Sequence, residues 1–68
     1  MDSKAIGKKL RELRNENKEP METVGNAVGV SRQSIQLYES GQRIPSDDIK
    51  IKLAAHFDST VQEIFFDI

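Results

Sequence analysis

The most informative stretch is residues 20–41, PMETVGNAVGVSRQSIQLYESG, which predicts two short helices joined by a tight turn. Val24, Ala27 and Val28 have the i, i+3, i+4 spacing of one apolar stripe along a helix. The proline that opens the stretch suits a first helical turn, since it lacks the N–H that would be unpaired there. Gly29 follows the stripe directly, where a left-handed residue ends a helix and only glycine adopts that conformation without steric cost.

The second helix of the stretch is expected to begin after Ser31, whose hydroxyl can cap it, and to end at Gly41. Ile35 and Tyr38 mark its inward side. A mid-helix glycine costs about 1 kcal/mol relative to alanine. We therefore expect Gly25 to lie where a backbone or side chain of the second helix packs against it.

This spacing resembles the helix-turn-helix of the phage-repressor and Cro type, also called the Xre family. The resemblance covers residues 4–66 and rests on a small residue at position 25, glycine at 29, apolar residues at 24, 28, 30 and 35, and the run YESGQRIP after them. It implies an all-α, compact five-helix repressor-like domain whose helices 2 and 3 form the helix-turn-helix. Residues 1–68 then form a single DNA-binding domain.

Length and composition limit the alternatives. A chain of 68 residues makes one domain, which buries only about 60% of its unfolded surface. The absence of cysteine excludes disulfides and thiolate metal sites. No apolar run approaches the roughly 18 residues of a membrane span, and the first residues, MDSK, do not open a signal peptide. The expected location is cytoplasmic, without membrane contact.

Charge is distributed unevenly along the chain, whose net charge is −1. Residues 1–43 contain eight Lys or Arg and six Asp or Glu, whereas residues 44–68 contain two and five. A basic first part fits a module whose one face meets an anion. A solvated surface explains so modest an asymmetry about as well.

The remaining helices follow from caps and apolar spacing. Asp2 or Ser3 can cap a first helix that runs to about Asn17. Ser46 can cap a fourth helix, and Thr60 with Glu63 forms a capping box for a last short helix at about residues 60–66. The buried stripes of these three helices are Ile6, Leu10 and Leu13; Ile49, Leu53, Ala54 and Phe57; and Val61, Ile64, Phe65 and Ile68.

The last helix has more apolar side chains than a small core absorbs. Phe66 falls off its apolar stripe, and Ile68 has no following residues to cover it. We expect a homodimer contact formed by Phe65, Phe66 and Ile68, with simple core packing as the equal alternative.

An enzyme is not expected from these residues. His56 is the only histidine and has no thiolate partner for a metal site, and Ser31 and Ser34 have no base at a suitable spacing. The glycine spacing fits no phosphate-binding loop. We predict no catalytic residue, metal or cofactor.

The outward side of the second helix carries side chains suited to DNA bases. With Ile35 and Tyr38 inward, a step of about 100° per residue turns Gln33, Gln36 and Leu37 outward and sets Arg32 at the flank. Arginine can bind guanine, glutamine adenine, and an apolar side chain the thymine methyl group. By resemblance, these four residues occupy the family's base-contacting positions in the helix at about residues 31–40.

The alternative is that these side chains are ordinary exposed helix residues. Leu37 favours a contact, because an exposed leucine between polar neighbours has little other reason to be there. Ser31, Ser34 and Arg43 are candidates for phosphate contacts, which fix register without carrying sequence information. Lys9 is a further candidate, although a solvated surface better explains the charges of the first helix.

The resemblance also implies a structural ion pair and shows one departure. Arg14 and Glu39 occupy the positions of a family pair that joins the ends of the first and third helices. In the family, the second helix usually starts with apolar-Thr-Gln, where the threonine caps the helix and the glutamine reaches a phosphate; this chain has Glu19-Pro20-Met21 instead. Met21 cannot donate a hydrogen bond, and Glu19 and Glu22 would place negative charge near a phosphate.

These observations favour a sequence-specific DNA-binding transcriptional regulator, a repressor that uses the helix at about residues 31–40 in the major groove. Its partners would be double-stranded DNA with an inverted-repeat operator and a second copy of the chain. The alternative is a protein-interaction module on the same scaffold, such as an antitoxin or a partner of another regulator.

Overall fold

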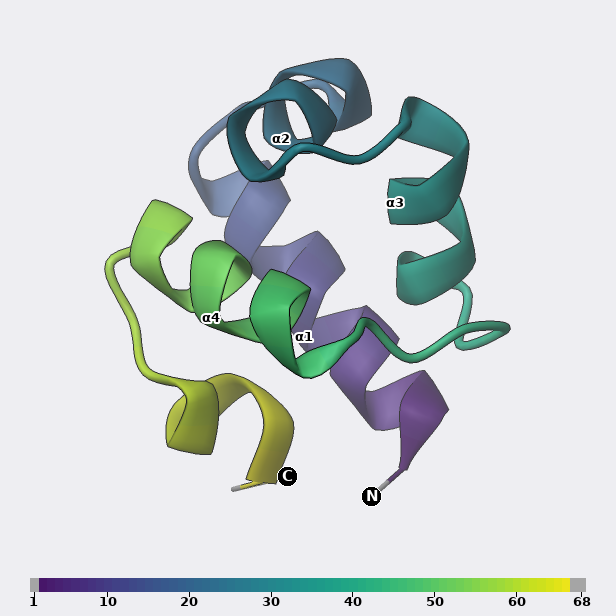
Figure 1. Cartoon of the computed structure of the whole chain (residues 1–68), viewed down its shortest axis with the longest axis vertical. Helices are drawn as coiled ribbons and strands as arrows, with labels where there is room; N and C mark the ends of the chain where they lie inside the picture. Colours follow the sequence, from purple (N-terminus) through teal and green to yellow (C-terminus); the bar gives the residue numbers. More distant parts are fainter. Residues whose placement is uncertain (1, 67–68) are drawn as a thin grey trace.

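The computed structural model describes residues 2–66, and every structural statement below concerns these residues. The described residues form four α-helices followed by a short π-helical segment, and they contain no strand (Figure 1). Their bounds are α1 Ser3–Glu16, α2 Met21–Val28, α3 Arg32–Glu39, α4 Asp47–His56 and η1 Gln62–Phe66. The prediction of an all-α domain with five helices is confirmed; its last helix is a π-helical turn.

Side chains just before three helices determine where these begin. Of the two candidate caps of α1, Asp2 is the one used, since its Oδ1 accepts hydrogen bonds from the backbone N–H groups of Lys4 and Ala5. Ser31 and Ser46 likewise accept from the N–H groups three residues ahead, at the starts of α3 and α4. Pro20 is the residue before α2, where its backbone is extended and its side chain makes no capping hydrogen bond. Because proline has no N–H, it leaves no unpaired backbone donor at this position.

Two glycines end the central helices in the left-handed conformation expected from the sequence. Gly29 has φ 81° after α2, and its N–H donates to the carbonyl oxygen of Gly25 at 2.8 Å. Gly41 has φ 79° after α3. Both carbonyl-capping turns therefore reverse the chain within a few residues.

The core gathers residues from every helix. Its members are Ile6, Leu10, Val24, Val28, Ile35, Tyr38, Leu53, Ala54, Phe57, Ile64 and Phe65. Ala27, expected in the stripe of α2, is exposed. The buried side of α2 is centred instead on Val24, Gly25 and Val28, because α2 packs its Gly25 side against the turn that follows it.

Two glycines allow backbones to approach closely. A Cβ at Gly25 would lie 2.7 Å from the carbonyl oxygen of Val30, so the turn, and not the second helix as expected, packs against it. A Cβ at Gly7 would lie 2.3 Å from the carbonyl oxygen of Glu39. Gly7, which the sequence did not single out, therefore lets α1 touch the end of α3.

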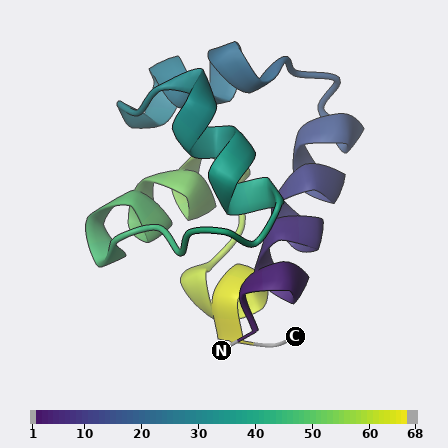
Figure 2. The ribbon, with the colours of Figure 1, turned by 90° about the vertical axis from the view of Figure 1, so that its right-hand side faces the viewer.

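The arrangement leaves α3 uncovered on its outer side. Figure 2 shows α3 in front of the other helices, with α1 on one side of it, α4 on the other, and the connection to α4 passing beneath its C-terminal end. α2 lies at the top of the molecule in Figures 1 and 2, above α1 and beside the start of α3. The helix predicted to contact DNA thus packs against α1 and α2, and its outer side stays uncovered.

Candidate nucleic-acid interface

The outer side of α3 presents polar side chains. Ile35 and Tyr38 are buried, and Arg32, Gln33 and Gln36 are exposed on the opposite side. Leu37 is half-buried, so only part of its side chain is available for contact. The helix therefore offers hydrogen-bond donors and acceptors together with one partial apolar surface.

Three of the four residues predicted to contact phosphate lie together on one flank of α3. The hydroxyl of Ser31 accepts a hydrogen bond from the N–H of Ser34 at 3.1 Å and donates to the hydroxyl of Ser34 at 3.1 Å. Arg43 Nη1 reaches the same Ser34 hydroxyl at 3.5 Å. Lys9 is not part of this group, because it lies on α1 about 200° around the helix from Gly7, the residue that faces α3.

Arg14 and Glu39 form the ion pair that the resemblance implies. Arg14 Nε donates to Glu39 Oε2 at 2.6 Å and Nη2 donates to Oε1 at 3.0 Å, and the two side chains are 14% and 6% exposed. Arg14 Nη1 also donates to the carbonyl oxygen of Glu19 at 2.9 Å. One guanidinium group thus joins α1, the end of α3 and the connection before α2.

The hydrogen bond to Glu39 raises the pKa of Arg14, with the attraction of the Glu39 charge adding to it and burial opposing it. A group whose pKa is raised by folding contributes stability below its unfolded pKa and loses that contribution as the pH rises through its folded pKa. Both values lie far above neutral for arginine. The raised pKa of Arg14 therefore adds no pH dependence to stability near neutrality.

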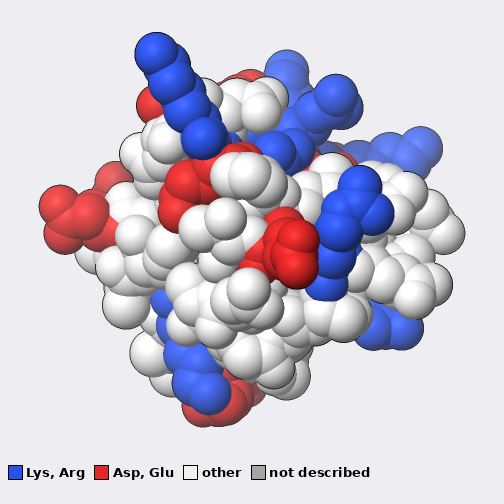
Figure 3. All heavy atoms as spheres, turned by 90° about the horizontal axis from the view of Figure 1, so that it is seen from above, with Lys and Arg blue, Asp and Glu red and all other residues white. Residues whose placement is uncertain are grey.

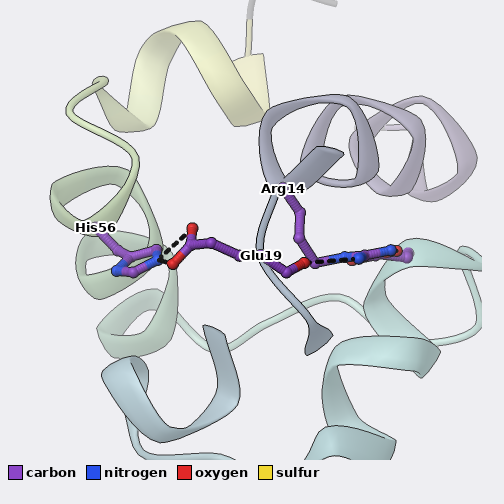
Figure 4. A network of polar contacts seen from close by, with 4 residues as sticks. Arg14, Glu19 and His56 are labelled. Atoms are coloured by element: carbon purple, nitrogen blue, oxygen red, sulfur yellow. Dashed lines mark hydrogen bonds and ion pairs between the residues drawn. The ribbon is translucent and has the colours of Figure 1, made fainter. Parts of the chain in front are cut away.

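Glu19 corrects one expectation from the sequence. Its carboxylate does not face the exposed side of α3; both of its oxygens lie 3.0 Å from His56 Nε2 at the end of α4. Figure 4 shows His56 and Arg14 on either side of Glu19. No local sequence pattern signals this contact, because 37 residues separate the two side chains.

The C-terminal surface corrects a second expectation. Phe65 is 1% exposed and packs in the core, so it cannot line a surface for a partner. Phe66 is 54% exposed and shares an open hollow with Ile51, which is 60% exposed. The buried Lys50 also lines this hollow, and its Nζ lies 5.8 Å from the ring centres of Phe65 and Phe66. Ile68, the third residue predicted to form a dimer contact, lies outside the described residues.

Basic side chains gather toward the α3 side of the molecule. Figure 3, seen from above, shows several Lys and Arg side chains projecting from the half that carries α3. Within residues 2–66, no group of His, Asp and Glu side chains could hold a metal ion. None of the described helices is long and apolar enough to cross a membrane.

Comparisons with known sequences identify relatives of this chain. A family model described as helix-turn-helix matches residues 10–64. YgzD of Bacillus subtilis, an uncharacterized HTH-type transcriptional regulator, is 31% identical over 85% of this chain and 88% of its own length. A protein of Pyrococcus furiosus assigned to the HTH-type transcriptional regulatory proteins is 40% identical over 76% of this chain. The chain spans only 16 to 18% of the length of this and three other archaeal relatives.

Solved structures have the same fold. The restriction-modification controller protein C.AhdI from Aeromonas hydrophila superposes with a TM-score of 0.87 and 34% identity, over 94% of this chain and 97% of that one. The P22 c2 repressor in complex with a synthetic operator has a TM-score of 0.89 over 93% of this chain and 96% of that one. Because the two sequences are only 21% identical, this likeness shows a shared fold and no more. The matched family comprises DNA-binding transcription regulators and not enzymes. The chain belongs to this helix-turn-helix family of the Xre type.

Proposed function

We propose that this chain is a sequence-specific DNA-binding transcriptional regulator, acting as a repressor in the cytoplasm, with α3 as its recognition helix. The observation that carries this proposal is the uncovered outer side of α3, where Arg32, Gln33 and Gln36 are exposed. Membership of the helix-turn-helix family and the likeness to a controller protein at 34% identity support it.

The chemistry of that side matches base edges in the major groove. Arg32 is suited to guanine, Gln33 and Gln36 to adenine, and the exposed part of Leu37 to a thymine methyl group. The cluster of Ser31, Ser34 and Arg43 on one flank is suited to phosphate oxygens. Base contacts then supply specificity, and the flanking cluster supplies position.

Glu19 does not oppose this function. Because its carboxylate contacts His56 at the end of α4, its negative charge lies away from the outer side of α3. Glu22 stays exposed in the first turn of α2 and remains unfavourable to phosphate there. Modest affinity per subunit is therefore expected.

We also propose that two copies bind an inverted-repeat operator as a homodimer, with their recognition helices about 34 Å apart. Support comes from the two large apolar side chains Ile51 and Phe66, which lie exposed around one hollow with Val61. Burying this surface between two copies removes it from water and doubles the number of phosphate contacts.

The test is selection of bound sequences from a random DNA pool at low salt, followed by binding at physiological salt. An enriched inverted repeat that still binds at physiological salt supports the proposal and measures the half-site spacing. Binding without sequence preference that disappears with salt contradicts it, and then favours a protein-interaction module on this scaffold.

A further inference from the structure

A second arginine lies beside α3, on the flank opposite Arg43. An open hollow of about 230 Å³ separates α1, the start of α2 and the outer side of α3. Arg11, Met21, Gln36, Glu39 and Ser40 line it. The hollow therefore adjoins the face of α3 that carries the proposed base contacts.

Of the two charged residues that line this hollow, Arg11 is the one whose charge is not already paired. The Glu39 carboxylate is already bound by Arg14, and the Glu39 side chain is 6% exposed. Arg11 is exposed and, in the part of the chain that the structure describes, has no hydrogen-bond or ion-pair partner. Met21, its neighbour across the hollow, has no hydrogen-bond donor on its side chain. An anion entering the hollow would meet the Arg11 guanidinium as its main partner.

Positions along α3 show that the two arginines lie on opposite flanks. Ser34 contacts Arg43, and Gln36 shares the hollow with Arg11. Two residues along a helix correspond to a rotation of about 200°, so these two positions point to nearly opposite sides. Figure 2 shows α1 along one side of α3, while the connection that contains Arg43 passes beneath the C-terminal end of α3 towards α4 on the other side.

Two flanking arginines match the geometry of an occupied major groove. A helix with its side chains is about 10–12 Å wide and the groove is about 12 Å wide, so a sugar-phosphate strand borders each flank of the helix. Guanidinium groups bind phosphate through two parallel hydrogen bonds. A cation on each flank therefore holds the helix between the two strands.

We propose that Arg11 binds a backbone phosphodiester of the DNA strand on the α1 side of the groove, while the Ser31, Ser34 and Arg43 cluster binds the strand on the other side. This inference rests on the proposed role of α3 as a recognition helix. It assigns the phosphate contact near the start of α2, which Met21 cannot make, to a side chain of α1.

Arg11→Ala with Lys8→Ala as matched control tests the assignment, because both changes remove one positive charge from an exposed position of α1 and only Arg11 lines the hollow. The measurement is the slope of log affinity against log salt, on the selected operator and on an unrelated duplex. Arg11→Ala should lower the magnitude of the slope by about 0.9 and weaken binding to both duplexes roughly tenfold. Arg11→Lys should keep the slope, and Lys8→Ala should leave both values near wild type.

A scan of single methylphosphonates, which neutralise one phosphate at a time, locates the contact. The wild type should lose affinity at one phosphate per half-site at which Arg11→Ala loses nothing further. Equal slopes for wild type and Arg11→Ala, or equal effects of Arg11→Ala and Lys8→Ala, overturn the assignment while operator binding by the wild type stands. Absence of any DNA binding by the wild type overturns the proposed function and this assignment together.

Discussion

Single residues determine how tightly α1 and α3 are joined. Gly7 removes the side chain that would collide with the backbone at Glu39, and Arg14 then reaches the Glu39 carboxylate with two hydrogen bonds. The close backbone approach and the partly buried ion pair both join α1 to α3 at Glu39. The end of the recognition helix is therefore held by α1 independently of any DNA.

Glu39→Gln should lower the free energy of unfolding by about 1–3 kcal/mol, because it removes the charge that satisfies a partly buried guanidinium. For a domain of this size, each 1 kcal/mol lowers the melting temperature by about 4–8 °C. Glu16→Gln, at an exposed position of α1, is the control and should leave the melting temperature almost unchanged. An unchanged melting temperature in Glu39→Gln would show that the pair does not contribute to stability.

Arg32→Ala should weaken binding to the selected operator by about 1–3 kcal/mol, since it removes a proposed bidentate contact to guanine. It should also relax the preference at one base pair of each half-site. The measurement is competition between the operator and single base-pair variants. Equal loss of affinity for every sequence would make Arg32 a phosphate contact instead.

The connection between α1 and α2 makes contacts with two different helices. Glu19, in the connection between α1 and α2, accepts from His56 at the end of α4, and its carbonyl oxygen accepts from Arg14. Both side chains of the Glu19 and His56 contact are about one-fifth exposed. The start of α2 is thereby tied to α1 and α4, which compensates for the absence of a side-chain cap at Pro20.

A double-mutant cycle of Glu19→Ala and His56→Ala should give a coupling free energy of about 0.5–1.5 kcal/mol in denaturant unfolding. Asp48 and Lys52 are the control pair, because they lie at i and i+4 on α4 with side chains 75% and 51% exposed. Their coupling should be smaller, about 0.3–0.5 kcal/mol. Additive effects of the two changes at Glu19 and His56 would contradict a stabilising contact.

The molecule as a whole has two exposed surfaces with different chemistry, the polar side of α3 and the apolar hollow around Ile51 and Phe66. In a dimer of the proposed kind, the first surface meets DNA and the second meets a copy of the chain. Affinity and operator spacing then depend on both.

Phe66→Ser should yield a folded monomer, because it removes the exposed ring of the hollow and leaves Phe65 in the core. The measurement is sedimentation equilibrium over a range of protein concentrations, with circular dichroism to verify folding. Ile44→Ser, which removes an exposed apolar side chain on the connection before α4, is the control and should keep the dimer. A monomeric wild type, or a dimeric Phe66→Ser variant, would contradict this interface.

Local patterns were sufficient to predict the helices and the exposed side of α3. Caps, left-handed glycines and the spacing of apolar residues act within four residues along the chain, so they can be recognised without knowing the fold. The exposed polar side of α3 follows from the same periodicity, as does the burial of Ile35 and Tyr38. Here sequence patterns alone determined which segments are helical and which side of α3 faces solvent.

Contacts between distant residues depended on how the helices cross. Three such features depend on how helices cross: the pairing of Glu19 with His56, the close approach at Gly7 and the position of Arg11 beside Gln36. The burial of Phe65 next to an exposed Phe66 depends in addition on a short π-helical turn. Periodicity predicts which side of a helix is apolar but not which neighbour it meets. Only the tertiary structure decided these contacts, because they are set by the packing of several helices at once.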